Sequence, residues 1–283
     1  MRIADAYQAF LLDLDGVVWR GETPVPGAAD AVEALRDSGK RVVFVTNNAS
    51  RSARDYAAKL MRMRIPTEPA DVVTSAHAVV DHLHEVGIER GARVHVFGTA
   101  ALVQVLKAAG FTTTKDASGI DAVVVAWNPR LTFDDLARTA DAARTGAPLI
   151  GANRDATYPA EDGLLPGTGA ILAAVEVASG RQATVVGKPA PYLFRSALDR
   201  AGTPVDQTLF VGDRIDSDVV GARAAGLPVA LVLSGVTLRA DLTSLDGVPD
   251  LVLDDLGGLL DEADVPARQR PGVGQSSSAN SRA

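Results

Sequence analysis

Short apolar runs, many rich in Val, alternate with amphipathic stretches along the first 262 residues. Short apolar runs are typical of buried strands, and apolar residues three or four positions apart are typical of one helical face. The predicted strands are Phe10–Leu12, Arg41–Val45, Val72–Val73, Arg93–Gly98, Ala122–Ala126, Pro148–Ile150, Val185–Val186, Thr208–Val211, Val229–Leu233 and Leu251–Leu253. The predicted helices are Ala28–Ser38, Arg51–Met63, Ser75–Val86, Ala100–Ala109, Phe133–Thr145, Ile171–Ala178, Pro191–Ala201, Val219–Ala225 and Leu256–Glu262. This alternation predicts an α/β fold with parallel strands.

One group of these elements forms a block of its own. From about Arg90 to Ser179 the βα pattern starts afresh, and its last helix follows a polar, Gly- and Pro-rich stretch at 151–169 that we interpret as a loop. The end of that stretch, Pro166-Gly167-Thr168-Gly169, lacks the full glycine pattern of a dinucleotide-binding loop, so we interpret it as a helix entry. The composition of residues 267–283 predicts a disordered tail.

Composition and charge narrow the class of protein. The 283 residues are 47% hydrophobic and 22% charged, as in a globular chain with a real core. The net charge of -7 is spread without basic blocks, which argues against nucleic acid as a partner. The chain has no cysteine, which excludes disulfides and thiolate metal sites. The N-terminus lacks an apolar signal segment and no apolar run is long enough to cross a bilayer, so we expect a cytoplasmic protein without a membrane partner.

The stretch Phe10-Leu11-Leu12-Asp13-Leu14-Asp15-Gly16-Val17 places two carboxylates at the end of a buried strand. On a continuing strand both would point to one face, where their burial would be very costly. Gly16 predicts instead that the chain turns and presents Asp13 and Asp15 at the carboxyl edge of the sheet, where open parallel sheets bind ligands. Two close carboxylates favour a cation between them, and oxygen ligands suit Mg²⁺. Taken alone, the motif is equally compatible with a surface turn.

Polar residues suited to phosphate chemistry follow three further strands. They are Thr46 and Asn47, then Lys188, then Asp213 and Asp218. A phosphoryl group needs a nucleophile, donors for its non-bridging oxygens, a cation for its charge and a proton source for the leaving oxygen. The four strand ends together supply each of these. Their joint placement therefore favours phosphate chemistry over the ordinary roles of a turn threonine or a solvated lysine.

These motifs resemble those of a known superfamily. Asp13-Leu14-Asp15-Gly16-Val17, Thr46, Lys188 and Gly212-Asp213 with Asp218 are similar, in this order, to the four motifs of the haloacid dehalogenase superfamily. The stretches that resemble its p-nitrophenylphosphatase-like branch are Trp19-Arg20-Gly21, Pro24-Val25-Pro26-Gly27-Ala28, Val45-Thr46-Asn47-Asn48-Ala49-Ser50, Pro166-Gly167-Thr168-Gly169, Gly180-Arg181-Gln182-Ala183 and Gly187-Lys188-Pro189. That branch includes phosphoglycolate, pyridoxal phosphate and glycerol phosphate phosphatases and the NagD-like enzymes.

The resemblance spans residues 9 to 262 and carries expectations about the fold. It implies a Rossmann-like, doubly wound parallel-sheet core that an α/β cap domain interrupts between the second and third motifs. We accordingly assign residues 1–88 and 180–266 to the core and residues 89–179 to the cap, in agreement with the independent βα block found above.

The resemblance also implies an activity: the protein would be a Mg²⁺-dependent phosphatase that hydrolyses small phosphomonoesters through an aspartyl-phosphate intermediate. Asp13 would then be the nucleophile, and Asp15 would protonate the leaving oxygen and later deprotonate the water. Thr46 and the backbone amide of Asn47 would hold phosphoryl oxygens. Lys188 would neutralise charge on both the nucleophile and the phosphate.

By the same resemblance, Mg²⁺ would bind the Asp13 carboxylate, the Asp15 backbone carbonyl and Asp213, with Asp218 holding metal-bound water. The motif does not require Asp216, which we predict to be exposed or a helix N-cap. A second polar cluster, Asp81-His82-Leu83-His84-Glu85, invites a metal assignment. Its two histidines stand i, i+2 on a helix and diverge, so we interpret the cluster as an exposed face.

Substrate selection is expected in the cap, at Asn153, Arg154, Asp155 and Tyr158. In the similar phosphatases the corresponding segment closes over the core and contacts the leaving group. Pyridoxal phosphate phosphatases resemble it closely but carry a histidine where this chain has Tyr158. That departure weakens the case for pyridoxal phosphate and leaves a ring that can pack on a substrate. Tyr158 as simple surface cover is the alternative interpretation.

Other functions on this sequence pattern remain open at this stage. A regulatory phospho-aspartate acceptor combines similar residues on a doubly wound sheet, but the chain length, the inserted cap and Asp15 argue against it. A phosphotransferase or mutase on the same fold is the third possibility. The expected partner is a small phosphorylated metabolite, and the sequence leaves the oligomeric state open, a homodimer included.

Overall fold

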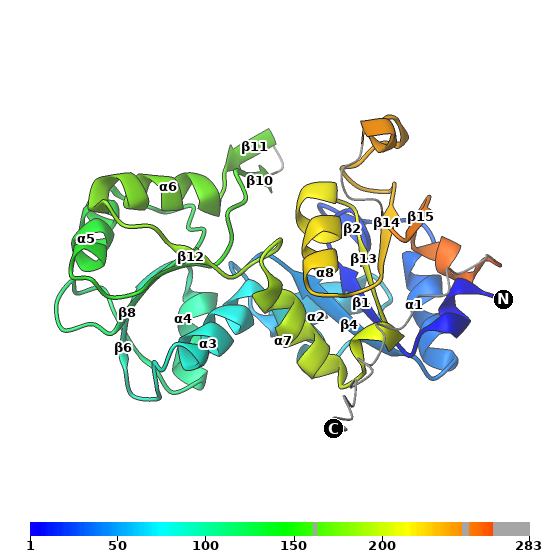
Figure 1. Cartoon of the computed structure of the whole chain (residues 1–283), viewed down its shortest axis with the longest axis horizontal. Helices are drawn as coiled ribbons and strands as arrows, with labels where there is room; N and C mark the ends of the chain where they lie inside the picture. The colour runs from blue at the N-terminus through cyan, green and yellow to red at the C-terminus, as the bar shows by residue number, and fades with distance from the viewer. Residues whose placement is uncertain (161–162, 245–248, 263–283) are drawn as a thin grey trace, which may run out of the picture.

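Two parallel sheets organise the part of the chain that the computed structural model describes, residues 1–160, 163–244 and 249–262. One sheet has six strands in the order β15-β14-β13-β1-β4-β5, and the other has five in the order β12-β9-β8-β6-β7. Figure 1 shows the two sheets at opposite ends of an elongated molecule, with helices α3 and α7 between them. None of the described helices has the length and apolar character needed to span a membrane.

The six-stranded sheet forms the core. Its strands are β1 (Ala9–Asp13), β4 (Arg41–Thr46), β5 (Val72–Thr74), β13 (Thr208–Gly212), β14 (Val229–Val232) and β15 (Leu251–Leu253). The α-helices around it are α1 (Ala28–Asp37), α2 (Ala53–Arg62), α3 (Ser75–Glu85), α7 (Pro191–Ala201) and α8 (Val220–Ala224). Shorter elements are the hairpin β2 (Trp19–Arg20) and β3 (Thr23–Pro24), the 3-10 helices η1 (Ile3–Ala6), η2 (Pro69–Asp71), η3 (Val205–Gln207), η5 (Arg239–Ser244) and η6 (Leu256–Leu260), and the π-helical turn η4 (Ile215–Val219).

The topology of the core explains where a ligand can bind. The chain first adds β4 and β5 to one side of the buried strand β1, and later adds β13, β14 and β15 to its other side, all in parallel. The strand order therefore reverses at β1. In open parallel sheets, the carboxyl ends of the strands at such a reversal form the ligand-binding crevice. The predicted doubly wound α/β fold is confirmed.

The five-stranded sheet belongs to the segment inserted between α3 and α7. Its strands are β6 (Arg93–Phe97), β7 (Thr112–Thr114), β8 (Ala122–Val125), β9 (Leu149–Gly151) and β12 (Thr184–Val185), and its helices are α4 (Ala100–Ala108), α5 (Phe133–Arg144) and α6 (Thr168–Ser179). We call this segment the cap. Because β12 pairs with β9, the cap sheet extends past residue 179, where we had placed the boundary, and we propose that the cap ends at Val185.

A continuous apolar cluster joins the two sheets. It includes Val43 and Val45 of β4, Phe194 of α7, Leu83 of α3 and Leu106 of α4. Separate clusters cover the other face of each sheet, one beneath α1 and α2 and one beneath α5 and α6. This shared cluster fixes the orientation of the cap sheet relative to the core, because the side chains of the cluster cannot separate without exposing apolar surface to water.

Two sequence-based predictions are wrong. The stretch 151–169 is not a simple loop, because Thr157–Ala160 (β10) pairs with Gly163–Pro166 (β11) in an antiparallel hairpin. All four residues of β11 are exposed, Leu164 and Leu165 included, so this strand shows no alternation of buried and exposed positions that the sequence could reveal. The cluster at 81–85 is not an exposed face throughout, because His82 is buried with its ring 4.6 Å from that of Tyr192. Asp216 is exposed, as predicted.

Candidate active site

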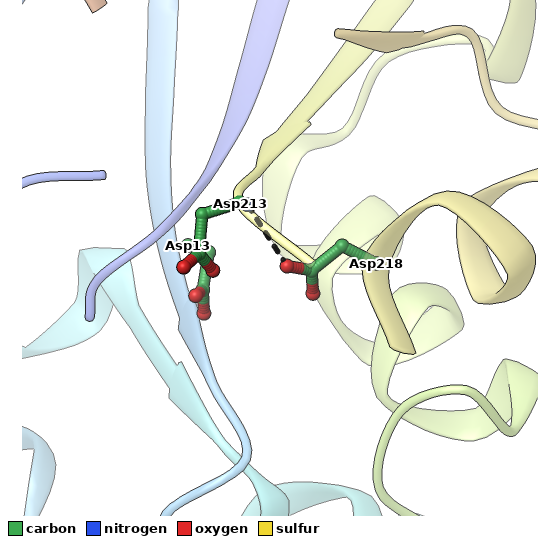
Figure 2. A group of neighbouring side chains, drawn as sticks. All are labelled: Asp13, Asp213 and Asp218. Carbon is green, nitrogen blue, oxygen red and sulfur yellow. Dashed lines mark hydrogen bonds between the residues drawn. The ribbon is translucent and has the colours of Figure 1, made fainter. Parts of the chain in front are cut away.

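Three aspartates meet at the carboxyl ends of the two central strands. Asp13 is the last residue of β1, Asp213 directly follows β13, and Asp218 lies in η4. Figure 2 shows the three side chains converging, and each offers a carboxylate oxygen within 4.8 Å of the others. All three residues are buried. Grouped carboxylates in a buried position repel one another, so the group calls for positive charge nearby.

Lys188 supplies one positive charge to this group. Its Nζ lies 2.7 Å from Asp13 Oδ1 and 2.7 Å from Asp218 Oδ1, and the lysine is only 4% exposed. Burial alone would lower the pKa of Lys188, but the two carboxylates raise it above its usual range. Burial raises the pKa of Asp13, and burial with the neighbouring Asp218 raises that of Asp213 to about 6. One ammonium does not balance three carboxylates, so the site fits a divalent cation.

The loop after β14 holds Asp213 and the turn after β1 in place. Val236 N–H donates to Asp213 Oδ2 at 2.6 Å, and Ser234 Oγ donates to the Gly16 carbonyl at 2.7 Å. Gly16 has a φ of +84°, and a Cβ there would lie 2.2 Å from Asp213 Oδ2. Only glycine therefore lets the turn after β1 approach Asp213 so closely.

Asp218 is held by the backbone of the strand end that it faces. Its Oδ2 accepts hydrogen bonds from the amides of Asp213 and Arg214, each at 3.1 Å. The residue has no exposed surface. With Oδ2 held in this way, Asp218 Oδ1 faces Lys188 Nζ at 2.7 Å, and the carboxylate lies in the same group as those of Asp13 and Asp213.

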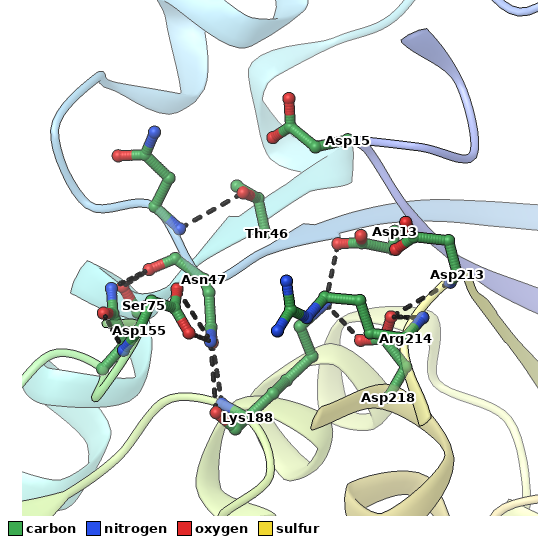
Figure 3. A network of polar contacts seen from close by, with 12 residues as sticks. Asp13, Asp15, Thr46, Asn47, Ser75, Asp155, Lys188, Asp213, Arg214 and Asp218 are labelled. Carbon is green, nitrogen blue, oxygen red and sulfur yellow. Dashed lines mark hydrogen bonds and ion pairs between the residues drawn. The ribbon is translucent and has the colours of Figure 1, made fainter. Parts of the chain in front are cut away.

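Asp15 is placed apart from this group, as Figure 3 shows. Asp15 is exposed as a residue, and its Oδ1 accepts a hydrogen bond from the Trp19 indole Nε1 at 2.9 Å. Desolvation of the carboxyl group by the protein around it raises the pKa of Asp15 above its ordinary value. A carboxyl group with a raised pKa that does not belong to the cation-binding group is suited to proton transfer.

Asn47 links three segments rather than standing free at the end of β4. Its side chain accepts from Lys188 N–H at 2.7 Å and donates to the Lys188 carbonyl at 3.1 Å and to Asp155 Oδ1 at 3.2 Å. Its carbonyl accepts from Asn153 Nδ2 at 2.7 Å and from the Ser75 hydroxyl. The hydroxyl oxygen of the neighbouring Thr46 accepts from Asn48 N–H at 3.2 Å. These side chains hold the strand end in one conformation (Figure 3).

The cap residues predicted for substrate selection divide into two groups. Asn153, Asp155 and Tyr158 line a cavity shared with the core, whereas Arg154 does not line it. The Arg154 guanidinium instead makes two hydrogen bonds to Glu176 of α6, at 3.0 and 2.6 Å. In the part of the chain that the structure describes, Arg154 is therefore an exposed side chain that pairs with Glu176 of the cap and is not among the residues that line the cavity.

The cavity has a volume of about 540 Å³ and reaches from Asp13 and Lys188 to the hairpin β10–β11. Sequence reasoning missed five of the residues that line it, Trp127, Arg51, Lys59, Thr168 and Arg214. Trp127 stacks on Tyr158 with ring centroids 3.8 Å apart and 11° between the planes, and its Nε1 donates to the Pro166 carbonyl. Two of them carried a signal: Trp127 lies just beyond the buried strand β8, and Thr168 lies in the stretch Pro166-Gly167-Thr168-Gly169.

The arrangement has the parts that phosphoryl transfer needs. A carboxylate beside an ammonium can attack phosphorus, the acidic group can hold a cation, and a separate acid can move a proton. The adjoining cavity has room for a small leaving group under the aromatic pair.

Two family models match the chain, one over the first part of the core and the start of the cap, the other over the second part of the core. The model described as haloacid dehalogenase-like hydrolase matches residues 10–112, and the one described as HAD-hydrolase-like matches residues 185–259. Among curated relatives, the chain is 41% identical over 260 residues to a D-glycerol 3-phosphate phosphatase of Mycobacterium tuberculosis, an alignment that covers 91% of this chain and 72% of the relative. It is 34% identical to an acid sugar phosphatase of Staphylococcus epidermidis, over 88% of this chain and 95% of that one.

Solved structures give the same result. A crystal structure of glycerol phosphate phosphatase from Mycobacterium tuberculosis in complex with magnesium superposes with a TM-score of 0.87 at 40% identity, covering 93% of this chain and 79% of that one. A p-nitrophenyl phosphatase from Archaeoglobus fulgidus superposes with a TM-score of 0.84 at 31% identity, over 90% and 98% of the two chains.

Proposed function

The chain belongs to the haloacid dehalogenase-like hydrolases, and from this premise we propose that it is a Mg²⁺-dependent phosphatase of small phosphomonoesters. The observation that carries the proposal is the buried contact of 2.7 Å between Asp13 Oδ1 and Lys188 Nζ, at the reversal of the strand order and beside two further aspartates. The assignment of roles to single residues below is part of the proposal.

The donor set fits Mg²⁺, because three buried carboxylates face a single ammonium. Asp13, Asp213 and the backbone carbonyl of Asp15 would hold the ion, with Asp218 acting through a water molecule. Bound there, Mg²⁺ supplies positive charge that stabilises the phosphoryl oxygens during transfer.

The first half of the reaction uses the two aspartates of the motif after β1. A carboxylate oxygen of Asp13 attacks phosphorus, and the bond from phosphorus to the leaving oxygen breaks. Asp15 gives its proton to that oxygen, so the product leaves as an alcohol. Lys188 stays beside Asp13 and neutralises charge, while the Thr46 hydroxyl and the Asn47 amide hold phosphoryl oxygens.

The second half frees the enzyme. Asp15, now a carboxylate, takes a proton from a water molecule, whose oxygen attacks phosphorus. The bond between phosphorus and Asp13 breaks, which releases inorganic phosphate and restores both side chains. The same residue thus serves as acid and as base, which requires a side chain that does not bind the ion. The observation that the Asp15 carboxylate is not part of the group formed by Asp13, Asp213 and Asp218 supports this role.

The proposed substrates are phosphomonoesters of small metabolites, including glycerol phosphate, phosphoglycolate and sugar phosphates, with p-nitrophenyl phosphate as an artificial substrate. Two observations support this range. The names of the relatives described above refer to phosphatases of such esters, and the cavity beyond Asp15 has the size of a small molecule. A cytoplasmic location and a homodimer remain sequence-based predictions, which cell fractionation and light scattering would test.

Release of inorganic phosphate tests the proposal. The protein should hydrolyse several of these esters with Mg²⁺, lose activity in excess chelator, and regain it when Mg²⁺ is restored. Asp13→Asn, assayed in parallel, controls for a contaminating phosphatase. Failure to release phosphate from any ester, or equal rates with and without chelator, would contradict the proposal. A phosphoprotein that persists for minutes without releasing phosphate would point to a phospho-aspartate acceptor instead.

A further inference from the structure

The hydrogen bond between Trp19 and Asp15 is a feature that the reaction described above leaves unused. Trp19 lies on β2 and has no exposed surface, and its indole Nε1 donates to Asp15 Oδ1 at 2.9 Å. The backbone brings the two residues together as well, because they form an isolated β-bridge and Gly16 N–H donates to the Trp19 carbonyl at 2.7 Å. The turn that carries Asp15 therefore closes on Trp19.

The Trp19 ring is fixed by its surroundings. Tyr56 of α2 lies nearly parallel to it, with 6.4 Å between ring centroids and 6° between planes. The Lys59 ammonium lies 4.2 Å from the ring centroid, a cation–π distance. Lys59 is itself buried and donates to the Gly21 carbonyl in the β2–β3 turn at 2.6 Å. A ring held in this way cannot follow Asp15 if that carboxylate rotates, so the indole sets the orientation of the carboxylate.

We propose that Trp19 is a positioning residue that orients Asp15 for proton transfer, an inference that rests on the proposed function. An indole N–H can only donate, so Asp15 Oδ1 must remain an acceptor toward it. The transferable proton is therefore carried by Oδ2. Oδ2 gives this proton to the leaving oxygen in the first step and takes one from water in the second, while Oδ1 keeps its bond to Trp19 throughout.

A structural alternative makes a different prediction. Buried tryptophans usually find an acceptor for their N–H, so Asp15 could serve the indole rather than the reverse. In that case removing the N–H would slow every substrate equally, through a less stable fold. If Trp19 orients the acid, the loss should grow with the basicity of the leaving oxygen, because only a poor leaving group needs the proton.

Trp19→Phe separates the two cases, since it keeps an aromatic ring beside Tyr56 and Lys59 and removes the N–H. Phenyl phosphate and p-nitrophenyl phosphate are similar in shape, but the nitrophenolate leaves more easily. We expect kcat/KM to fall about 10- to 100-fold for phenyl phosphate and less than about 3-fold for p-nitrophenyl phosphate. Thr139→Val, which removes a buried hydrogen bond to His95 in the cap, should leave the ratio unchanged. Equal losses on both esters would overturn the inference.

A spectroscopic readout is independent of activity. The chain has two tryptophans, so a ¹⁵N-labelled sample gives two indole N–H signals, and Trp19→Phe identifies one by its absence. In Asp15→Leu, which has no acceptor, the Trp19 signal should shift and its hydrogen should exchange faster, while that of Trp127 stays in place. An unmoved Trp19 signal would overturn the inference. If the wild-type protein hydrolyses neither ester, the proposed function fails and this inference with it, whereas hydrolysis with equal Trp19→Phe losses overturns the inference alone.

Discussion

The core and the cap close on the same cavity but hold their residues in different ways. On the core side Asp13, Lys188 and Asp218 are buried, and each makes a charged contact of 2.7 Å. On the cap side Tyr158 is half-buried and Asp155 is exposed. Asp13 ends the central strand β1, Asp218 lies in η4 shortly after β13, and Lys188, between β12 and α7, contacts both of them. The cap residues lie on a loop and a two-stranded hairpin, which tolerate changes in sequence. This contrast supports the proposal that the core carries the chemistry and that the cap selects the substrate.

The division is not complete, because two cap residues also contact the strand end of the core. Asn153 donates to the Asn47 carbonyl at 2.7 Å, and Asp155 accepts from the Asn47 side chain. Both therefore help to fix the phosphate-binding strand end that Thr46 and Asn47 are proposed to form. Changes at these two cap positions should affect all substrates, whereas changes at Tyr158 should distinguish among them.

Asp13→Asn should show the largest effect on the core side. The substitution keeps the shape but removes the nucleophile and one proposed metal ligand, so kcat should fall by on the order of 10⁴–10⁶ for every substrate. Phosphate release with Mg²⁺ measures this, with circular dichroism as the control for folding. A variant that retains a tenth of wild-type activity would show that Asp13 is not the nucleophile.

Lys188→Met tests whether the buried charge network also stabilises the fold. It keeps the apolar stem but leaves Asp13 and Asp218 without their shared cation, so kcat should fall about 10²–10³-fold. The free energy of unfolding in chelator should fall by about 3 kcal/mol, as urea denaturation can measure. Lys115→Met, which removes an exposed ion pair to Asp135, should cost less than about 0.5 kcal/mol. Equal costs for the two variants would show that the network contributes nothing beyond a surface pair.

Tyr158→Ala probes the cap side. It removes one ring of the stacked pair with Trp127, so the relative kcat/KM among phosphoglycolate, glycerol phosphate and pyridoxal phosphate should change by about 1–3 kcal/mol. Hydrolysis of p-nitrophenyl phosphate should change less, because its chemistry rests on the core. If all four esters lose activity by the same factor, Tyr158 supports the structure of the cap and selects nothing.

Glu176→Gln should have the smallest effect on activity. It weakens the two hydrogen bonds from Arg154 and should lower the stability of the cap by about 1–2 kcal/mol without changing the order of substrates. The hydrogen bonds from Arg154 hold the pKa of Glu176 below its ordinary value of 4.5. The wild-type advantage is therefore fully present above about pH 4.5 and is lost as the pH falls below it. Thermal unfolding of both proteins between pH 3 and 7 measures this loss. If the order of preferred substrates changes in Glu176→Gln, Arg154 takes part in substrate selection after all.

The same contrast explains what the sequence could predict. The core strands are continuous apolar runs that end in polar residues, so the positions of Asp13, Thr46 and Asp213 followed from pattern and order. The strand before Lys188 was predicted for the core, but it is β12, a two-residue edge strand of the cap sheet, and its membership in that sheet depends on pairing with β9. The hairpin β10–β11 escaped prediction, because β11 is exposed along its whole length and has no alternating pattern. Side-chain partners such as Glu176 for Arg154, 22 residues away along the chain, depend on tertiary packing that no local pattern records.

Trapping the covalent intermediate tests the central claim most directly, that Asp13 carries the phosphoryl group. Asp15→Asn should slow the second step because it lacks the base that activates water, so the aspartyl-phosphate should accumulate with p-nitrophenyl phosphate, whose first step needs little acid. Borohydride reduces an acyl phosphate to an alcohol, which mass spectrometry of the proteolysed chain can locate. The account predicts homoserine at position 13 and none in Asp13→Asn. Reduction at another aspartate, or turnover by wild type with no acyl phosphate formed, would contradict it.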